Sequence, residues 1–186
     1  RIATGIIKWC LNNFKKYVFL TEAMNVVNER KRPYIVMEGM SDRFMATYKR
    51  PFEAKDIKVV MYAGGLHERY GLKKLTEAFM MLPQENFRLK LFGSGPFVEK
   101  LKTKYTKKDS RIQYMGVAPN AEVVAAELDA SLLVNPRPTH EEFTKYSFPS
   151  KNIEYMASGT PLLTTKLPGM PKEYYPYVFL IENESV

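Results

Sequence analysis

The sequence predicts an α/β fold, a Rossmann-like parallel sheet with helices on both faces, on the strength of three observations. Strand-like apolar runs alternate with helical segments from residue 57 onward, which is the pattern of βαβ units. The helical segments are amphipathic, as Leu72, Leu75 and Phe79 show by their spacing. Glycines or a long polar loop follow the carboxyl ends of the predicted strands, where ligands bind in such sheets.

The regular part of this pattern occupies residues 55–186. Strands are predicted at 57–62, 87–92, 111–115, 130–134, 162–165 and 177–181, and helices at 72–82, 98–105, 120–128 and 149–159. We expect Asn120 to cap the third helix. Ile153, Met156 and Ala157 should form the core-facing side of the fourth, which Gly159 ends.

Residues 1–54 are less regular. Helices are predicted at 2–14 and 21–28 and strands at 17–20 and 33–37, while the charged segment that ends near Ala54 indicates a linker. The chain begins inside an α/β pattern, so we expect an earlier portion of the natural protein to precede it.

The composition is that of an ordinary soluble globular protein, with 45% hydrophobic and 26% charged residues. A net charge of +8 calls for an anionic partner, such as nucleic acid, anionic lipid or a diphosphate-bearing substrate. No basic segment is interleaved with aromatics as in nucleic-acid-binding motifs, so we expect no nucleic acid partner. The apolar runs are too short to span a bilayer. The single cysteine, Cys10, fits a reducing, cytoplasmic compartment and is expected to be a buried, inert thiol.

The most informative stretch is residues 146–165. Pro149 suits the first turn of a helix, and Ser150 and Lys151 occupy that same turn. A helix start at a strand's carboxyl end, with a cation in its first turn, is a place to hold a phosphate. Glu154, one turn later, could accept hydrogen bonds from sugar hydroxyls. The alternative is that Lys151 and Glu154 form only a surface ion pair.

Other loops should converge on the same crevice. Gly64 and Gly65 follow a strand and would let backbone N–H groups approach an anion, with Arg69 as a nearby cation. A flexible turn is the alternative for this segment. The long loop 135–147 carries Arg137, and long ordered loops in compact domains tend to be functional. The Gly-Ser-Gly turn at 93–95 is favoured as a plain turn, because a dinucleotide fingerprint needs a third glycine. P-loop, zinc-ligand and serine-hydrolase motifs are absent from the sequence.

These segments also carry a resemblance. Phe-Pro-Ser-Lys-x-x-Glu-Tyr-Met-Ala-Ser-Gly-Thr-Pro (148–161), with Tyr-Ala-Gly-Gly-Leu (62–66), Leu-Phe-Gly-Ser-Gly-Pro (91–96) and Tyr-Met-Gly (114–116), resembles the C-terminal half of a family 4 glycosyltransferase. That family has the two-domain GT-B fold. The motif at 148–161 resembles that of members that build bacterial capsule, O-antigen or exopolysaccharide chains. The resemblance implies that residues 1–54 are the end of the acceptor-side domain and a linker, and that residues 55–186 bind a nucleotide-sugar donor.

The resemblance also implies roles. Glu154 matches the second glutamate of the family's Glu-x7-Glu motif, which binds the ribose. The segment with Ser147, Phe148, Ser150 and Lys151 lies against the diphosphate and donor sugar, and Gly64, Gly65 and Gly116 belong to the donor-binding loops. This sequence departs from the family pattern in two places. Tyr146 stands where the family has the first glutamate of the motif, and Gly65 and Tyr70 stand where it has two phosphate-facing cations. We therefore expect Lys151, Arg69 and Arg137 to supply the positive charge, because a departing diphosphate must be stabilised. Lys151, Glu154 and Arg69 are the expected catalytic residues.

The predicted function is sugar transfer from a UDP- or GDP-linked donor to a saccharide or lipid-linked acceptor, without an essential metal or other cofactor. The expected location is the cytoplasm, with contact to the anionic inner face of the membrane. Two alternatives stay open on the sequence: a nucleotide-sugar epimerase of the GT-B fold, and a non-catalytic basic binding module.

Overall fold

The computed structural model describes residues 2–41, 45 and 55–185, with side chains from residue 5 onward. In this part the helices are α1 (Ile2–Asn13), α3 (Leu72–Met80), α4 (Phe97–Lys100), α5 (Thr106–Lys108), α6 (Asn120–Asp129) and α7 (Ser150–Ala157). The strands are β1 (Tyr17–Phe19), β2 (Tyr34–Val36), β3 (Lys58–Ala63), β4 (Phe87–Phe92), β5 (Ile112–Gly116), β6 (Leu132–Asn135), β7 (Leu162–Thr165) and β8 (Phe179–Ile181). The predicted linker falls mostly on residues outside the described ranges, as does the expected domain boundary.

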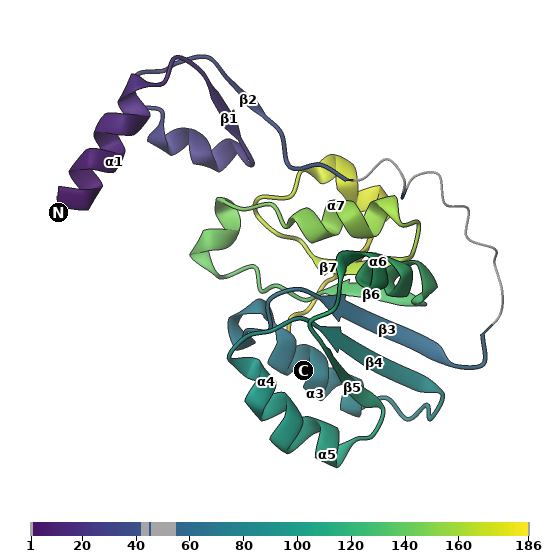
Figure 1. Cartoon of the computed structure of the whole chain (residues 1–186). Coiled ribbons are helices and arrows are strands. Elements are labelled where there is room, and N and C mark those ends of the chain that lie inside the picture. Colours follow the sequence, from purple (N-terminus) through teal and green to yellow (C-terminus); the bar gives the residue numbers. More distant parts are fainter. Residues whose placement is uncertain (1, 42–44, 46–54, 186) are drawn as a thin grey trace.

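The larger part of the chain is a Rossmann-like α/β unit, which confirms the predicted fold class. Its six strands are all parallel in the order β5-β4-β3-β6-β7-β8. In Figure 1 helices α3, α4 and α5 cover one face of the sheet and α6 and α7 cover the other. Strand β3 pairs with β4 on one side and with β6 on the other. The strand order therefore runs outward in opposite directions from the β3–β6 pair. This topological switch point is where such folds open a crevice for a ligand.

Alternation along β3 separates the two layers of the core. Val60 and Tyr62 pack in the cluster on the α3 side, while Val59, Met61 and Ala63 pack in the cluster on the α6 and α7 side. Side chains of consecutive strand residues point to opposite faces, so a central strand with helices on both sides must be apolar throughout. The helical segment from α4 to α5 is continuous through a π-helical turn at Leu101–Tyr105.

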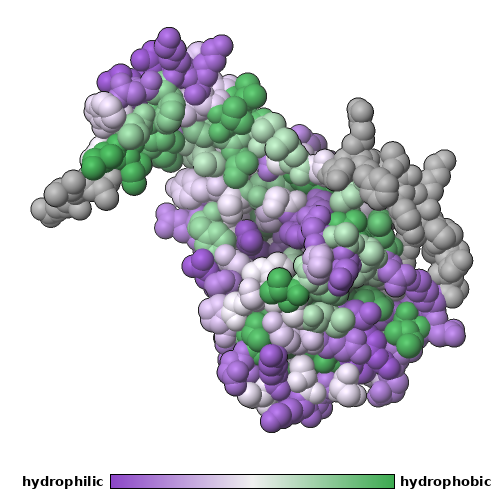
Figure 2. Space-filling view, viewed as in Figure 1, coloured by the Kyte–Doolittle hydropathy of each residue, from purple (hydrophilic) through white to green (hydrophobic). Residues whose placement is uncertain are grey.

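The N-terminal segment stands apart from this unit in Figure 1. Strands β1 and β2 form a separate two-stranded parallel sheet, and the second predicted helix is a 3₁₀ helix at Glu22–Val27. The Thr21 hydroxyl donates a hydrogen bond of 2.9 Å to the carbonyl oxygen of Lys145 in the larger unit. Figure 2 shows apolar side chains gathered on the surface of this segment, and Trp9 is 69% exposed.

Two local predictions were wrong, and a third holds only in part. Cys10 is exposed, because its face of α1 packs against no other described element. Asn120 is the first residue of α6 and does not cap it; Pro119 is the N-cap, and no side chain bonds there. On α7 the expected Ile153 and Met156 do pack against the core but are only partly buried, and the fully buried residues are Asn152 and Tyr155. The core under α7 is therefore partly polar, which apolar spacing alone cannot reveal.

Candidate functional site

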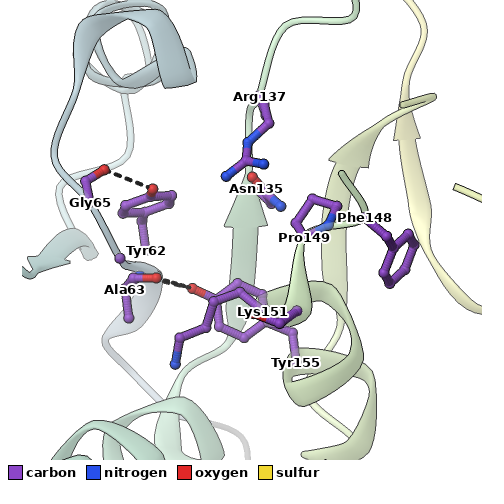
Figure 3. A pocket seen from close by; sticks show the side chains of 11 residues that line it. Tyr62, Ala63, Gly65, Asn135, Arg137, Phe148, Pro149, Lys151 and Tyr155 are labelled. Atoms are coloured by element: carbon purple, nitrogen blue, oxygen red, sulfur yellow. Dashed lines mark hydrogen bonds between the residues drawn. The ribbon is translucent and has the colours of Figure 1, made fainter. Parts of the chain in front are cut away.

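A cavity of about 230 Å³ lies at the switch point between β3 and β6. It is lined by the end of β3 with the following glycines, the end of β6 with its loop, and the start of α7: Tyr62, Ala63, Gly64, Gly65, Asn135, Arg137, Phe148, Pro149, Ser150, Lys151 and Tyr155. Figure 3 shows Arg137 reaching into this space between Tyr62 and Pro149. The two segments that the sequence singled out, the glycine pair and the helix start, therefore face one cavity.

The start of α7 offers free backbone N–H groups to this cavity. Pro149 is the N-cap residue and no side chain caps the helix, so the N–H groups of Ser150 and Lys151 have no intrahelical partner, whereas that of Asn152 donates to the Pro149 carbonyl oxygen at 2.9 Å. An N-terminus in this state carries a partial positive charge and binds anions. Ser150 and Lys151, both in the cavity wall, stand at this end of the helix.

Polar contacts in the core hold α7 in place. The Tyr155 hydroxyl accepts a hydrogen bond of 2.8 Å from the Ala63 N–H and donates one of 3.2 Å to the Ala63 carbonyl oxygen. The amide of Asn135 donates to the Asn152 side-chain oxygen at 2.6 Å, and the Thr164 hydroxyl donates to the Asn135 carbonyl oxygen. These bonds tie the helix start to the ends of β3, β6 and β7 and so fix the shape of the cavity.

Lys151 is shared between two carboxylates. Its ammonium lies 3.1 Å from Glu127 Oε1 and 2.8 Å from Glu154 Oε2. Glu127, near the end of α6, has no exposed surface, and this burial raises the pKa of its carboxyl to about 7, although the charge of Lys151 acts in the opposite direction. Figure 3 shows the Lys151 side chain running along Tyr155, away from Arg137. The predicted surface ion pair is therefore part of a half-buried triad.

Arg137 is held by aromatic rings. Its guanidinium carbon lies 4.7 Å from the centroid of the Tyr70 ring and 5.6 Å from that of Phe143, distances at which a cation is attracted to a ring face. Its Nε is buried and has no hydrogen-bond partner among the described residues, and burial lowers the pKa of the guanidinium. Arg69 packs on the same two rings at 5.4 and 5.3 Å. Because Arg137 lines the cavity, its guanidinium is placed beside the space that an anionic ligand would occupy.

The glycine loops lie packed against each other at the carboxyl edge of the sheet. Gly93 has a φ of +124°, and a Cβ there would come within 1.9 Å of the Gly64 carbonyl oxygen. The Tyr62 hydroxyl donates to the Gly65 carbonyl oxygen at 3.0 Å and so fixes the turn that faces the cavity. The second glycine turn thus supports the first by close backbone approach, and it does not line the cavity.

Five of the predicted site residues do not line the cavity. Arg69, Glu154, Tyr146, Ser147 and Gly116 are not among the residues that line the cavity. Glu154 reaches it only through Lys151, and Tyr146 is 40% exposed. Phe148 contributes to the wall, but its ring points away (Figure 3) and packs on Tyr174 with ring centroids 5.5 Å apart.

Sequence reasoning missed Tyr62, Asn135, Tyr155 and Glu127. The first three line the cavity, and Glu127 contacts its lysine. A signal for Asn135 was available, since an amide directly after a buried strand at a carboxyl edge is well placed for ligands. The other three lie within predicted strands or helices, where the sequence pattern gave no signal of a site.

Neither a metal-ligand cluster nor a membrane span stands out in the described part of the chain. Within residues 2–41, 45 and 55–185, no three His, Cys, Asp or Glu side chains are grouped so that they could hold a metal ion. Among the same residues no helix has both the length and the apolar character needed to cross a bilayer.

Comparison with known proteins gives a family match over most of the chain. Residues 57–184 match the family described as Glycosyl transferases group 1. A protein of Escherichia coli (strain K12), provisionally named as the colanic acid biosynthesis glycosyltransferase WcaL, is 30% identical over 112 residues, or 58% of this chain and 27% of the relative. The Salmonella typhimurium protein of the same name is 31% identical over 112 residues. The chain thus spans 27% of the length of these curated relatives.

Solved structures of low sequence identity share the fold. Sucrose-phosphate synthase from Thermosynechococcus elongatus gives a TM-score of 0.70 at 19% identity, covering 97% of this chain and 49% of that one. WaaG, a glycosyltransferase involved in lipopolysaccharide biosynthesis, gives 0.66 at 15% identity, with 88% and 48% covered.

Proposed function

Because this chain belongs to the group 1 glycosyl transferases, which match residues 57–184, we propose that it binds the nucleotide-diphosphate sugar of a sugar-transfer reaction. In this proposal residues 55–186 form the donor-binding half, and residues 1–54 are the end of the acceptor-side domain and the linker. The supporting observation is the cavity between the glycine pair, Arg137 and the uncapped start of α7.

The donor diphosphate would bind across the start of α7. Free N–H groups at Ser150 and Lys151, the backbone of Gly64 and Gly65, and the Arg137 guanidinium surround this position. Together they present donors and positive charge without an acidic side chain in the cavity wall. A helix N-terminus, flexible glycine backbone and arginine are the groups that proteins use for phosphates.

Catalysis would rest on leaving-group stabilisation. When the bond between the donor sugar and the diphosphate breaks, negative charge accumulates on the phosphate oxygens, and preorganised donors lower the barrier by meeting that charge. Lys151 and Arg137 stand in the cavity wall, and Arg69 lies beside Arg137 on the rings of Tyr70 and Phe143. Glu154 would accept hydrogen bonds from the ribose.

The reaction belongs to polysaccharide biosynthesis, since the relatives are named for colanic acid biosynthesis. UDP is the first donor nucleotide to test, because related folds have been solved with UDP. We propose a saccharide or lipid-linked acceptor, retention of the anomeric configuration, and a cytoplasmic location with contact to the anionic inner face of the membrane. As the chain spans 27% of the relatives' length, it should bind donor while transferring little or no sugar by itself.

Thermal stability with added nucleotides tests this proposal. A ligand that binds only the folded state raises its melting temperature, so one of UDP, GDP and ADP should do so, while its nucleoside should not. In the longer enzyme, replacing Lys151, Arg69 and Arg137 together by neutral residues should abolish turnover of the nucleotide sugar. Replacing Lys73, an exposed lysine of α3, is the control. Unchanged turnover in the triple variant would show that other groups carry the leaving-group charge.

A further inference from the structure

Glu127 is a fully buried carboxyl group that reaches the cavity only through a lysine. It has no exposed surface, and its Oε1 accepts a hydrogen bond of 3.1 Å from Lys151 Nζ. Its Oε2 is also buried and accepts no hydrogen bond from any residue in the described part of the chain. Buried carboxylate oxygens are usually partnered, and one without a partner requires an explanation.

The local charge balance supplies that explanation. One ammonium, that of Lys151, faces two carboxylates, Glu127 and Glu154, so the group carries a net negative charge when both are ionised. The charged groups that act on Glu127 both come from α7, and Tyr155 of the same helix is the further titratable group that faces it. Burial raises the pKa of Glu127 to about 7, Lys151 opposes the rise, and Glu154 adds to it. The unpartnered oxygen is the place where a proton would sit.

We propose that Glu127 is a positioning residue that holds the Lys151 ammonium at the start of α7 and, by taking up a proton on Oε2, releases it to an incoming diphosphate. The inference rests on the proposed function, since it assigns the anion to that helix start. A diphosphate beside Lys151 adds negative charge near Glu127 and so favours its neutral form. The proton comes from solvent, and Lys151 then has Glu154 and the diphosphate as its ionised partners.

The proposal fixes the sign of a pH dependence. Protonated Glu127 is the form that favours the anion, so affinity should be highest below the pKa of about 7 and should fall as the pH rises through it. If the bound anion raises the pKa of Glu127 by about one further unit, affinity drops roughly fivefold between about pH 6 and about pH 8.

The test compares the wild type with Glu127→Gln, which mimics the neutral carboxyl and keeps an oxygen for Lys151. Inorganic pyrophosphate is the probe, because it contains the diphosphate common to all candidate donors. Its dissociation constant is measured by NMR titration of each protein near pH 6 and near pH 8. Dividing the wild-type constant by that of the variant at the same pH cancels the ionisation of pyrophosphate. Glu122→Gln, an exposed position on the same helix, is the matched control.

The expected ratio for Glu127→Gln is about one near pH 6 and roughly five near pH 8, while Glu122→Gln stays at about one at both. A ratio for Glu127→Gln that does not change with pH overturns the inference and leaves the proposed function standing. If the wild type binds no pyrophosphate at either pH, the proposed diphosphate site is wrong and the inference falls with it.

A second measurement uses the wild type alone, in case the variant does not fold. The side-chain carboxyl carbon of Glu127 is followed by carbon-13 NMR across the pH range, with and without saturating pyrophosphate. A midpoint near 7 that rises with pyrophosphate supports the inference. A midpoint that stays unchanged when pyrophosphate binds contradicts it.

Discussion

The hydroxyl group of Tyr155 gives the most direct test of how the core fixes the site. Tyr155→Phe keeps the buried ring and removes one oxygen, which bonds to both the N–H and the carbonyl oxygen of Ala63. Tyr155 has no exposed surface and Ala63 only 3%, so the Ala63 backbone groups lose their partner at a site that is almost closed to bulk solvent. The variant therefore isolates the free energy of satisfying a buried backbone group from that of packing.

The magnitude follows from the cost of an unpaired buried group. A buried donor left without a partner costs about 1–3 kcal/mol, so we expect the free energy of unfolding to fall by about 2 kcal/mol. For a chain of this size that corresponds to a decrease in melting temperature of roughly 4–8 °C. The effect should lie almost entirely in the denaturation midpoint, because the surface exposed on unfolding is unchanged.

Urea denaturation followed by far-ultraviolet circular dichroism is the appropriate assay. Tryptophan fluorescence is unsuitable, since the single tryptophan, Trp9, lies on α1, outside the large sheet. Tyr177→Phe is the control, because that side chain is 75% exposed and its change should stay within about 0.5 kcal/mol. Equal midpoints for Tyr155→Phe, the control and the wild type would show that the hydroxyl contributes nothing and that the reasoning about α7 is wrong.

Three further predictions concern the site and its support. Lys151→Met should weaken pyrophosphate binding about tenfold in an NMR titration, because a charge-assisted hydrogen bond is lost; unchanged affinity would exclude the lysine from the anion site. Gly93→Ala should lower the melting temperature more than Gly116→Ala: both have positive φ, but a Cβ at Gly93 meets a backbone oxygen at 1.9 Å whereas Gly116 has open space, and equal losses would refute the close-packing argument. The Arg111 guanidinium lowers the pKa of Asp109, so this pair stabilises the fold fully above the ordinary Asp pKa of about 4, and the contribution is lost as the pH falls through the lowered pKa; Asp109→Asn should cost less stability at about pH 3 than at about pH 7 in urea titrations, and an equal cost at both would contradict the assignment.

Much of the fold could be predicted from local patterns. The strands at Phe87–Phe92 and Leu162–Thr165 begin and end where the sequence predicted them, because short segments rich in strand-forming residues between turn residues indicate strands. The helix start at Ser150 was likewise predictable from the proline before it. The errors occur where contacts with other elements determine which residues are buried. Cys10 lies on an apolar face that no described element covers, and α7 buries Asn152, a polar residue that periodicity assigns to the surface.

The candidate site, too, could be predicted from the sequence only in part. By itself, the sequence determined that a glycine turn and a helix start carrying Lys151 lie at the carboxyl edge of a parallel sheet, because the order of strands and helices along the chain dictates which loops share an edge. Only the tertiary structure decided that β3 and β6 are neighbours, and with them that Tyr155 bonds to Ala63 and that Glu127 meets Lys151. The physical reason is that apolar periodicity specifies which face of an element is buried. It carries no information about which distant residue completes a hydrogen bond or an ion pair there, and in this protein those pairings hold Tyr155 and Lys151 in the wall of the cavity.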